Sequence, residues 1–330
     1  MGTLITLIVS GLAEGALIFL MASGLSIILG MMGVINFAHG TLFLWGGYAY
    51  MFSYYSIRAR VILSVFPDAF QTGTQGGILR VTGVQLQAGQ YLPFSQELLI
   101  FVVSILIAVS VVFIMGIIFE KLFISRVYGN APAQILITLG LQVVFTDLVR
   151  VIWGPNMIPM SRPPFLDGVS SFAGGRIAHY NVFLIIVGAT VAIIIHRVIT
   201  KTRIGMVIRA GLQSPENVQA LGINIRKYFT VIFACGAALA GLGGALYMPL
   251  VGNVVSSAGM NNQILAFIVV VIGGLGNFMG SFLGSIFLGL MGVGVAVFLP
   301  AISVVANVLV MAIVLVFRPD GLFGKAVNKS

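Results

Sequence analysis

Residues 98–119 read LLIFVVSILIAVSVVFIMGIIF, a run that contains neither a charged residue nor a proline. A helix needs about 20 apolar residues to cross about 30 Å of hydrocarbon, because each residue adds about 1.5 Å along the helix axis. This run is long enough to span a bilayer. It therefore predicts a transmembrane helix.

Similar runs recur along the whole chain, and they set the fold class. Only helices or closed barrels satisfy the backbone in lipid, and the alternation typical of barrel strands is absent. Two shorter, glycine-interrupted runs, at 36–57 and 263–276, are either full spans or broken, re-entrant segments. We therefore predict an all-α polytopic membrane protein, one transmembrane domain over 1–330, with eight or nine crossings. The remaining apolar runs are 3–30, 134–152, 181–199, 228–250, 278–298 and 302–317.

The composition excludes a soluble protein. Hydrophobic residues make up 59% of the chain and charged residues 8%, whereas a soluble domain carries roughly 25% charged residues. The net charge of +9 does not indicate nucleic-acid binding, because the basic residues lie in short segments between apolar runs. The single cysteine, Cys235, excludes an intrachain disulfide.

The distribution of basic residues predicts the orientation. Segments 120–133, 197–227 and 318–330 hold eleven of the 17 Lys and Arg residues, and segments 58–97 and 150–180 hold the other six. Cytoplasmic loops carry the excess of positive charge. The first group, which includes the C-terminus, is therefore predicted to be cytoplasmic, with 58–97 as an extracytoplasmic loop insertion. The side of the N-terminus stays open.

Small residues recur inside the apolar runs at the spacing that lets two helix backbones approach closely. Gly11 with Gly15, and Gly280 with Gly284, are both GxxxG pairs. We favour packing within the chain over dimerisation through these faces.

The predicted cytoplasmic loop at 200–227 reads TKTRIGMVIRAGLQSPENVQALGINIRK and contains the signals of a short helix. Ser214 can cap the helix, Pro215 suits its first position, and Glu216 favours the positive end of its dipole. Gly222 offers a left-handed stop. The result is about two turns of helix, which is marginal unless it packs against something. It is either an ordinary interfacial helix or a docking element for a cytoplasmic partner.

Four stretches together carry a resemblance to a known family. The stretch 35–40 reads INFAHG, 273–277 reads GGLGN and precedes Gly280 and Gly284, and 318–324 reads RPDGLFG. With the 200–227 loop, they resemble permeases of the branched-chain amino acid family of ABC importers, in the family order. The ending resembles the shorter leucine/isoleucine/valine permease, although 58–97 is longer than this resemblance implies.

The resemblance implies the partners and the location. Two ABC ATPase subunits, a second permease that is either like or unlike, a periplasmic substrate-binding protein and membrane lipid are expected, in the bacterial cytoplasmic (inner) membrane. The chain has no GxxxxGK[ST] phosphate-binding loop, so ATP and Mg are expected on the ATPases and no cofactor on this chain. The implied ATPase-coupling residues are Arg209, Ser214, Pro215, Glu216, Asn217, Ala220, Gly222 and Ile223.

The resemblance also implies the solute, which is expected to be a branched-chain or other hydrophobic amino acid. Permeases of this kind also carry urea, short amides or aromatic acids. An ion-coupled secondary transporter, or a membrane scaffold or channel, is the alternative class. No Ser/His/Asp set and no cluster of metal ligands is visible in the sequence, so we expect neither a catalytic site nor a metal site.

Polar residues inside membrane spans are costly and are commonly kept for function. Asp147 and Arg150, three residues apart, are predicted to pair, with a proton or ion site at Asp147 as the alternative. Glu14 lies in the first span and has either a substrate-path role or a structural one. The ring of His39 either satisfies backbone groups freed by the break between the first two apolar runs, or lines the substrate path. The candidate path residues are Glu14, Asn36, Phe37, His39, Gly273 and Gly274.

Overall fold

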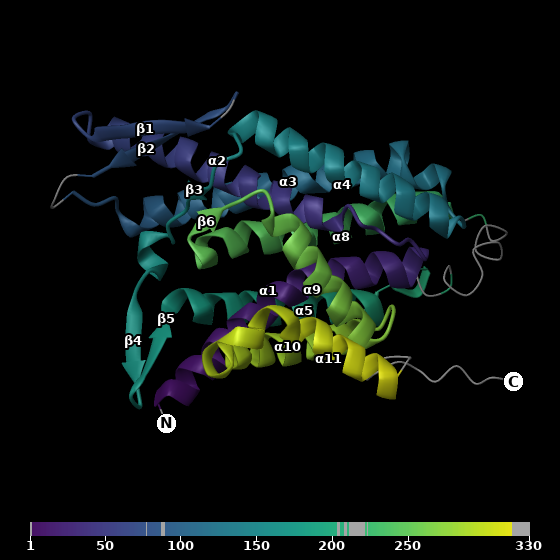
Figure 1. Cartoon of the computed structure of the whole chain (residues 1–330). Helices are drawn as coiled ribbons and strands as arrows, with labels where there is room; N and C mark the ends of the chain where they lie inside the picture. The colour runs from purple at the N-terminus through teal and green to yellow at the C-terminus, as the bar shows by residue number, and fades with distance from the viewer. Residues whose placement is uncertain are drawn as a thin grey trace, which may run out of the picture.

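The computed structural model describes residues 2–76, 78–86, 90–202, 205–207, 210, 222 and 224–318. Within these ranges, nine α-helices of at least fifteen residues pack into a bundle, in which α9 crosses its neighbours steeply (Figure 1). Their bounds are α1 (Gly2–Met32), α2 (His39–Val65), α3 (Phe94–Leu122), α4 (Ala131–Trp153), α5 (His179–Lys201), α8 (Ile225–Val251), α9 (Ala258–Gly273), α10 (Phe278–Phe298) and α11 (Ser303–Phe317).

Six of these helices, α1, α3, α4, α5, α8 and α10, are long and apolar enough to cross a membrane. The apolar helices α9 and α11 are shorter, and α2 is 27 residues long but more polar. The prediction of an all-α polytopic membrane protein is confirmed. Both uncertain runs belong to continuous helices, because 36–57 lies mostly in α2 and 263–276 mostly in α9.

The segments that connect the helices lie at two opposite ends of the bundle (Figure 1). Three antiparallel strand pairs, which the sequence analysis did not predict, lie at the end that also holds Gly2. There, the backbone N–H of Arg176 donates to Thr6 Oγ1 over 2.9 Å. The C-terminal side of α11 and the connection from α3 to α4 lie at the other end. The pairs are β1 (Phe70–Gly76) with β2 (Arg80–Gln85), β3 (Ile158–Pro159) with β6 (Asn253–Val254), and β4 (Val169–Phe172) with β5 (Gly175–Ala178).

The predicted loop at 58–97 is shorter than expected. Helix α2 continues to Val65 and α3 begins at Phe94, so only 66–93 is non-helical. Near these helix ends lies an ion pair that the apolar pattern does not reveal. Arg58 Nη2 donates to Glu97 Oε1 over 2.9 Å, and Glu97 is 4% exposed. This pair joins α2 to α3 beyond the end of their apolar runs.

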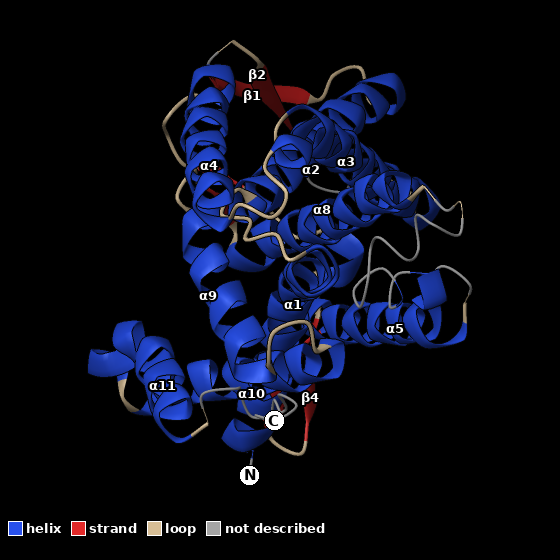
Figure 2. Ribbon diagram, turned by 90° about the vertical axis from the view of Figure 1, so that its right-hand side faces the viewer, coloured by secondary structure: helices blue, strands red, loops and turns tan. Residues whose placement is uncertain are grey.

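Helix α1 is the centre of the bundle, with α8, α5, α9 and α10 around it (Figure 2). Glycines allow this close packing. A Cβ on Gly11 would meet Leu290 Cα at 2.8 Å, and a Cβ on Gly280 would collide with the carbonyl of Gly273. Both GxxxG pairs therefore serve helix packing inside the chain, as favoured above.

Candidate functional site: a break between two helices

The chain between α1 and α2 is an irregular segment that is buried inside the protein. Helix α1 ends at Met32, and Gly33 follows with a φ of +62°, which favours glycine. The next residues run without helical structure until His39 begins α2. Val34, Asn36 and Ala38 are each 0% exposed. Non-helical backbone at membrane depth is tolerated only where it is buried in protein or lines a cavity.

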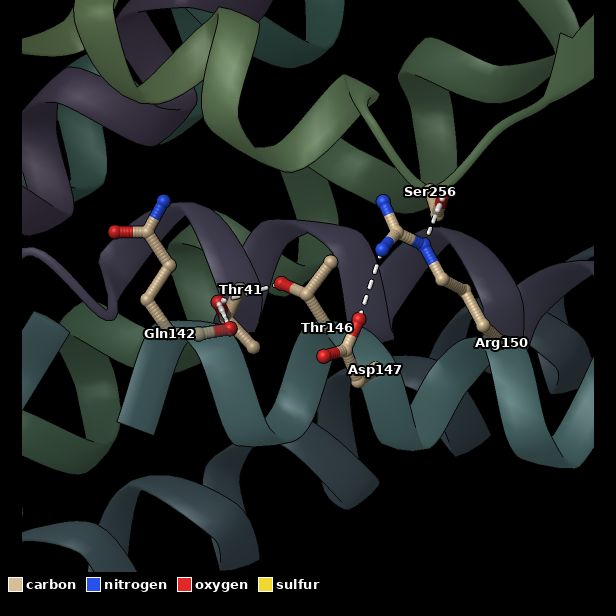
Figure 3. Close-up of polar contacts among 6 residues, drawn as sticks. All are labelled: Thr41, Gln142, Thr146, Asp147, Arg150 and Ser256. Atoms are coloured by element: carbon tan, nitrogen blue, oxygen red, sulfur yellow. Dashed lines mark hydrogen bonds and ion pairs between the residues drawn. The ribbon is translucent and has the colours of Figure 1, made fainter. Parts of the chain in front are cut away.

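Contacts with α4 show how deep this break reaches (Figure 3). Thr41, in the first turn of α2, lies beside Gln142 and Thr146: its Oγ1 is 3.4 Å from the carbonyl oxygen of Gln142 and 3.5 Å from Thr146 Oγ1. Gln142 follows Ala131, the first residue of α4, by eleven residues, which is about 16 Å along the helix. Helix α4 has 23 residues, or about 34 Å. The N-terminus of α2 therefore lies about halfway along α4.

Two glutamine side chains bind the backbone of the break. The N–H of Ile35 donates to Gln134 Oε1 over 3.2 Å, and Gln263 Nε2 lies 3.5 Å from the carbonyl oxygen of Asn36. Gln134 is 2% exposed and Gln263 3% exposed. Amides from α4 and α9 thus replace the hydrogen bonds that a continuous helix would have made.

The side chains at the same place have unused hydrogen-bonding capacity. The amide oxygen and nitrogen of Asn36, and Oε1 of Gln263, are buried and bond to no residue that the structure describes. Leaving a buried polar group unpaired costs about 1–3 kcal/mol. Such a cluster in a well-packed protein needs an explanation.

His39 is fully buried but points towards α1. Its Nε2 lies 3.0 Å from the carbonyl oxygen of Met21, so this nitrogen carries the proton and donates. Nδ1 has no partner among the described residues. Met21 lies within α1, eleven residues before its end, so the carbonyl that His39 contacts is not a group freed by the break. That part of our expectation was wrong, because the two glutamines satisfy the freed backbone instead.

Helix α9 covers the break with one face. The rings of Phe37 and Phe267 are 5.0 Å apart, and Gln263 lies one helical turn from Phe267. A Cβ on Gly40 would collide with the carbonyl of Gly259, so the first turns of α2 and α9 are in backbone contact. The break therefore combines free amide groups with an aromatic pair.

The other candidate path residues lie elsewhere. Glu14 is half-buried in α1, eighteen residues before the end of that helix. Gly273 is buried against Gly280, and Gly274 ends α9 with a φ of +88°. Both glycines have packing and turn roles here, and their place in a substrate path stays a prediction.

The predicted pair in α4 is present. Arg150 Nη1 donates to Asp147 Oδ1 over 2.8 Å, and Arg150 Nε donates to Ser256 Oγ over 3.0 Å (Figure 3). Both charged side chains are about half exposed, at 47% and 58% for Arg150 and Asp147. The pair ties α4 to the connection between α8 and α9.

Most of the predicted ATPase-coupling residues lie outside the described part of the chain. Gly222 is described, and its φ of +79° agrees with the left-handed conformation expected there. Asn224 caps α8 by accepting a hydrogen bond from the N–H of Lys227. The residues outside are Arg209, Ser214, Pro215, Glu216, Asn217, Ala220 and Ile223.

Sequence reasoning missed four buried polar residues. Gln134, Gln263, Glu97 and Glu120 are each less than 5% exposed. All four lie at or near the ends of apolar runs, where we expected polar side chains to belong to the exposed loops. The signal that could have identified them as buried is a polar side chain within two helical turns of the end of an apolar run. Among the described residues, no group of three or more His, Cys, Asp or Glu is placed to bind a metal.

Comparison with known proteins defines the family. Residues 7–318 match the family model described as branched-chain amino acid transport system, permease component. The chain belongs to this family. It is 26% identical over 326 residues to the high-affinity branched-chain amino acid transport system permease protein BraD of Pseudomonas aeruginosa, covering 96% of this chain and 95% of that one.

A second relative agrees. The permease protein LivH of Escherichia coli K12, from a high-affinity branched-chain amino acid transport system, is 23% identical over 321 residues, covering 96% of this chain and 94% of LivH. No solved structure matches the chain significantly. The protein is therefore an integral membrane permease that works as a component of an ABC-type transport system.

Proposed function

We propose that this permease is the transmembrane subunit of an ATP-driven ABC importer for a small amphiphilic solute. Branched-chain or other hydrophobic amino acids are the proposed solutes, delivered by a periplasmic binding protein. Two ABC ATPases and a second permease complete the proposed complex. The observation that carries the proposal is the buried break between α1 and α2, with its unpaired amides beside the N-terminal half of α4, in a chain of this family.

The chemistry of the break suits an amphiphilic solute. The Asn36 amide and Gln263 Oε1 offer donors and an acceptor, and the Phe37–Phe267 pair offers an apolar surface. The N-terminus of α2 points the positive end of a helix dipole at the same place, which favours a carboxylate. An amino acid with an apolar side chain carries both kinds of group.

The charge count supports an orientation for the complex. The described parts of the segments rich in Lys and Arg, which include the connection from α3 to α4, the C-terminal end of α5 and the N-terminal end of α8, lie at the end away from the strands (Figure 1), and we assign this end to the cytoplasm. Gly2 lies against Gly175, the first residue of β5, at the strand end, so the N-terminal end of α1 is proposed to be extracytoplasmic. The 200–227 segment then faces the ATPases, with the C-terminus on the same side.

Co-purification with the candidate ATPases tests the proposal. We expect Glu216→Arg to weaken ATPase association while membrane insertion stays intact, because it reverses a charge in the proposed docking helix. Pull-down from detergent-solubilised membranes measures this association. Unchanged association would remove the docking role from this segment. Uphill uptake by the permease alone in vesicles, driven by an ion gradient, would refute the ATP-driven importer altogether.

Asn36→Leu separates a transport role from a structural one. The Asn36 amide has no described partner, so its replacement by a side chain of similar size is expected to keep or raise the melting temperature. Uptake by the assembled complex is expected to fall about tenfold, which corresponds to about 1.4 kcal/mol of lost solute interaction. Normal uptake with normal stability would show that the solute does not use this amide.

A further inference from the structure

Glu120, in the last turn of α3, is a buried carboxylate that holds three parts of the chain together. It is 2% exposed. Its Oε1 accepts a hydrogen bond of 2.6 Å from the Tyr128 hydroxyl, and its Oε2 accepts one of 2.6 Å from Thr230 Oγ1. Tyr128 lies in the connection between α3 and α4, and Thr230 lies in the second turn of α8.

Both bonds are short and strong for their type. The low dielectric of a buried site strengthens a hydrogen bond between a hydroxyl and a carboxyl group. Burial, and then the bond to Glu120, raise the pKa of the Tyr128 hydroxyl above its usual range, so it stays a donor. The Tyr128 ring also lies 5.5 Å from that of Phe229 in α8. Helix α8 therefore cannot shift against the α3–α4 connection without breaking these contacts.

The same connection is bonded onward to the helix break. Gln134 Nε2 donates to the carbonyl oxygen of Val127 over 3.2 Å, and its Oε1 accepts from the N–H of Ile35 over 3.2 Å. Both ends of one buried amide are thus in use. We call Glu120, Tyr128, Thr230 and Gln134, with the Ile35 N–H, the Glu120 junction.

The first residues of α8 are also the last residues of the 200–227 segment, because α8 begins at Ile225. The Glu120 junction thus connects the end of the proposed docking segment to the residue that precedes Asn36. We infer that the Glu120 junction transmits movement of the docking segment to the break between α1 and α2, with Glu120 and Gln134 as positioning residues. This inference rests on the proposed function.

Two near-isosteric variants test the junction in the complete complex, with ATPases, second permease and binding protein in proteoliposomes. Thr230→Val and Tyr128→Phe each remove one hydroxyl donor to Glu120. We expect ATPase rate and subunit co-purification to stay within twofold of wild type. Solute uptake per ATP hydrolysed is expected to fall at least about fivefold, the lower end of typical coupling between sites.

Further variants separate coupling from general damage. Thr230→Ser keeps the hydroxyl that donates to Glu120 and is expected to retain the wild-type ratio of solute uptake to ATP hydrolysis. Gln134→Leu removes the hydrogen bond to the N–H of Ile35 and leaves Glu120 unchanged. It is expected to lower solute uptake per ATP in the same way. Tyr228→Phe is the matched control, because the hydroxyl of Tyr228, in the first turn of α8, bonds to no described residue.

The outcomes distinguish this inference from the proposed function. If the wild-type complex shows no ATP-dependent uptake, the importer proposal fails and the junction loses its basis with it. If the wild type is coupled and Thr230→Val, Tyr128→Phe and Gln134→Leu keep its uptake per ATP, the importer proposal stands and the junction is overturned. A fall in uptake per ATP in Tyr228→Phe as large as in Tyr128→Phe would also overturn the proposed role of the junction.

Discussion

Replacement of Gly244 by valine is expected to prevent the permease from reaching its folded state. Gly244 lies in α8 and is buried, and a Cβ there would collide with the carbonyl of Phe43 in α2 and lie 3.1 Å from the backbone nitrogen of Gly47. Overpacking a core usually costs about 1–3 kcal/mol. The obstacle here is helix backbone and not a movable side chain, so we expect the cost to exceed that range.

Fluorescence size-exclusion profiles and melting temperature in detergent measure the effect. Gly140→Ala is the matched control, because Gly140 lies in α4 with no atom within 4 Å of its added Cβ. In a helix interior, alanine is about 1 kcal/mol more favourable than glycine, so the control is expected to match or exceed wild-type stability. A monodisperse, wild-type-like Gly244→Val protein would contradict the close contact between α2 and α8.

Removal of one partner of the Arg58–Glu97 pair is the second large effect that we expect. Arg58 Nε and Nη2 both donate to Glu97 Oε1, over 3.0 and 2.9 Å, and the two side chains are 19% and 5% exposed. Arg58→Leu leaves the Glu97 carboxylate buried without its cation. Breaking a buried pair in this way costs about 3–5 kcal/mol.

The double variant Arg58→Leu/Glu97→Leu is expected to be much more stable than Arg58→Leu alone. An apolar pair of similar volume often replaces a buried ion pair at little cost. Melting temperatures of the two single variants and the double variant give the coupling energy through a double-mutant cycle. Additive effects would show that the two side chains do not depend on each other.

The exposed pair in α4 is the control for this cycle. Arg150→Leu removes a partner of Asp147, but both side chains are about half exposed. Exposed pairs contribute about 0–1 kcal/mol, so the melting temperature is expected to change little. A large loss there would show that exposure does not decide the cost of breaking these pairs.

Much of the fold was predictable because hydrophobic length is a local property. The run 278–298 has the same bounds as α10, and 302–317 differs from α11 by one residue. The Asp147–Arg150 pair was predictable for the same reason, since both residues lie in one helix. The bounds of α2 and α3 were not predicted, because both helices continue past their apolar runs into polar residues, Arg58 and Glu97 among them.

The candidate site was predictable only in part. Asn36, Phe37 and His39 were candidates because they belong to the 35–40 stretch, INFAHG, that carries the family resemblance. Their partners Gln134 and Gln263 lie 99 and 227 residues away from the residues that they contact. Nothing in the local pattern indicates such partners.

The amino-acid sequence by itself determined that this chain crosses a membrane as a bundle of helices. The free-energy cost of exposing polar backbone and side chains to lipid depends on each residue and its neighbours in the chain, so it can be read from the sequence. The tertiary structure alone decided which polar groups are paired and which are left free. Pairing depends on the distance between helices that are far apart in the chain. Helix α4 brings Gln134 to the break, α9 brings Gln263 to it, and α8 brings Thr230 to Glu120.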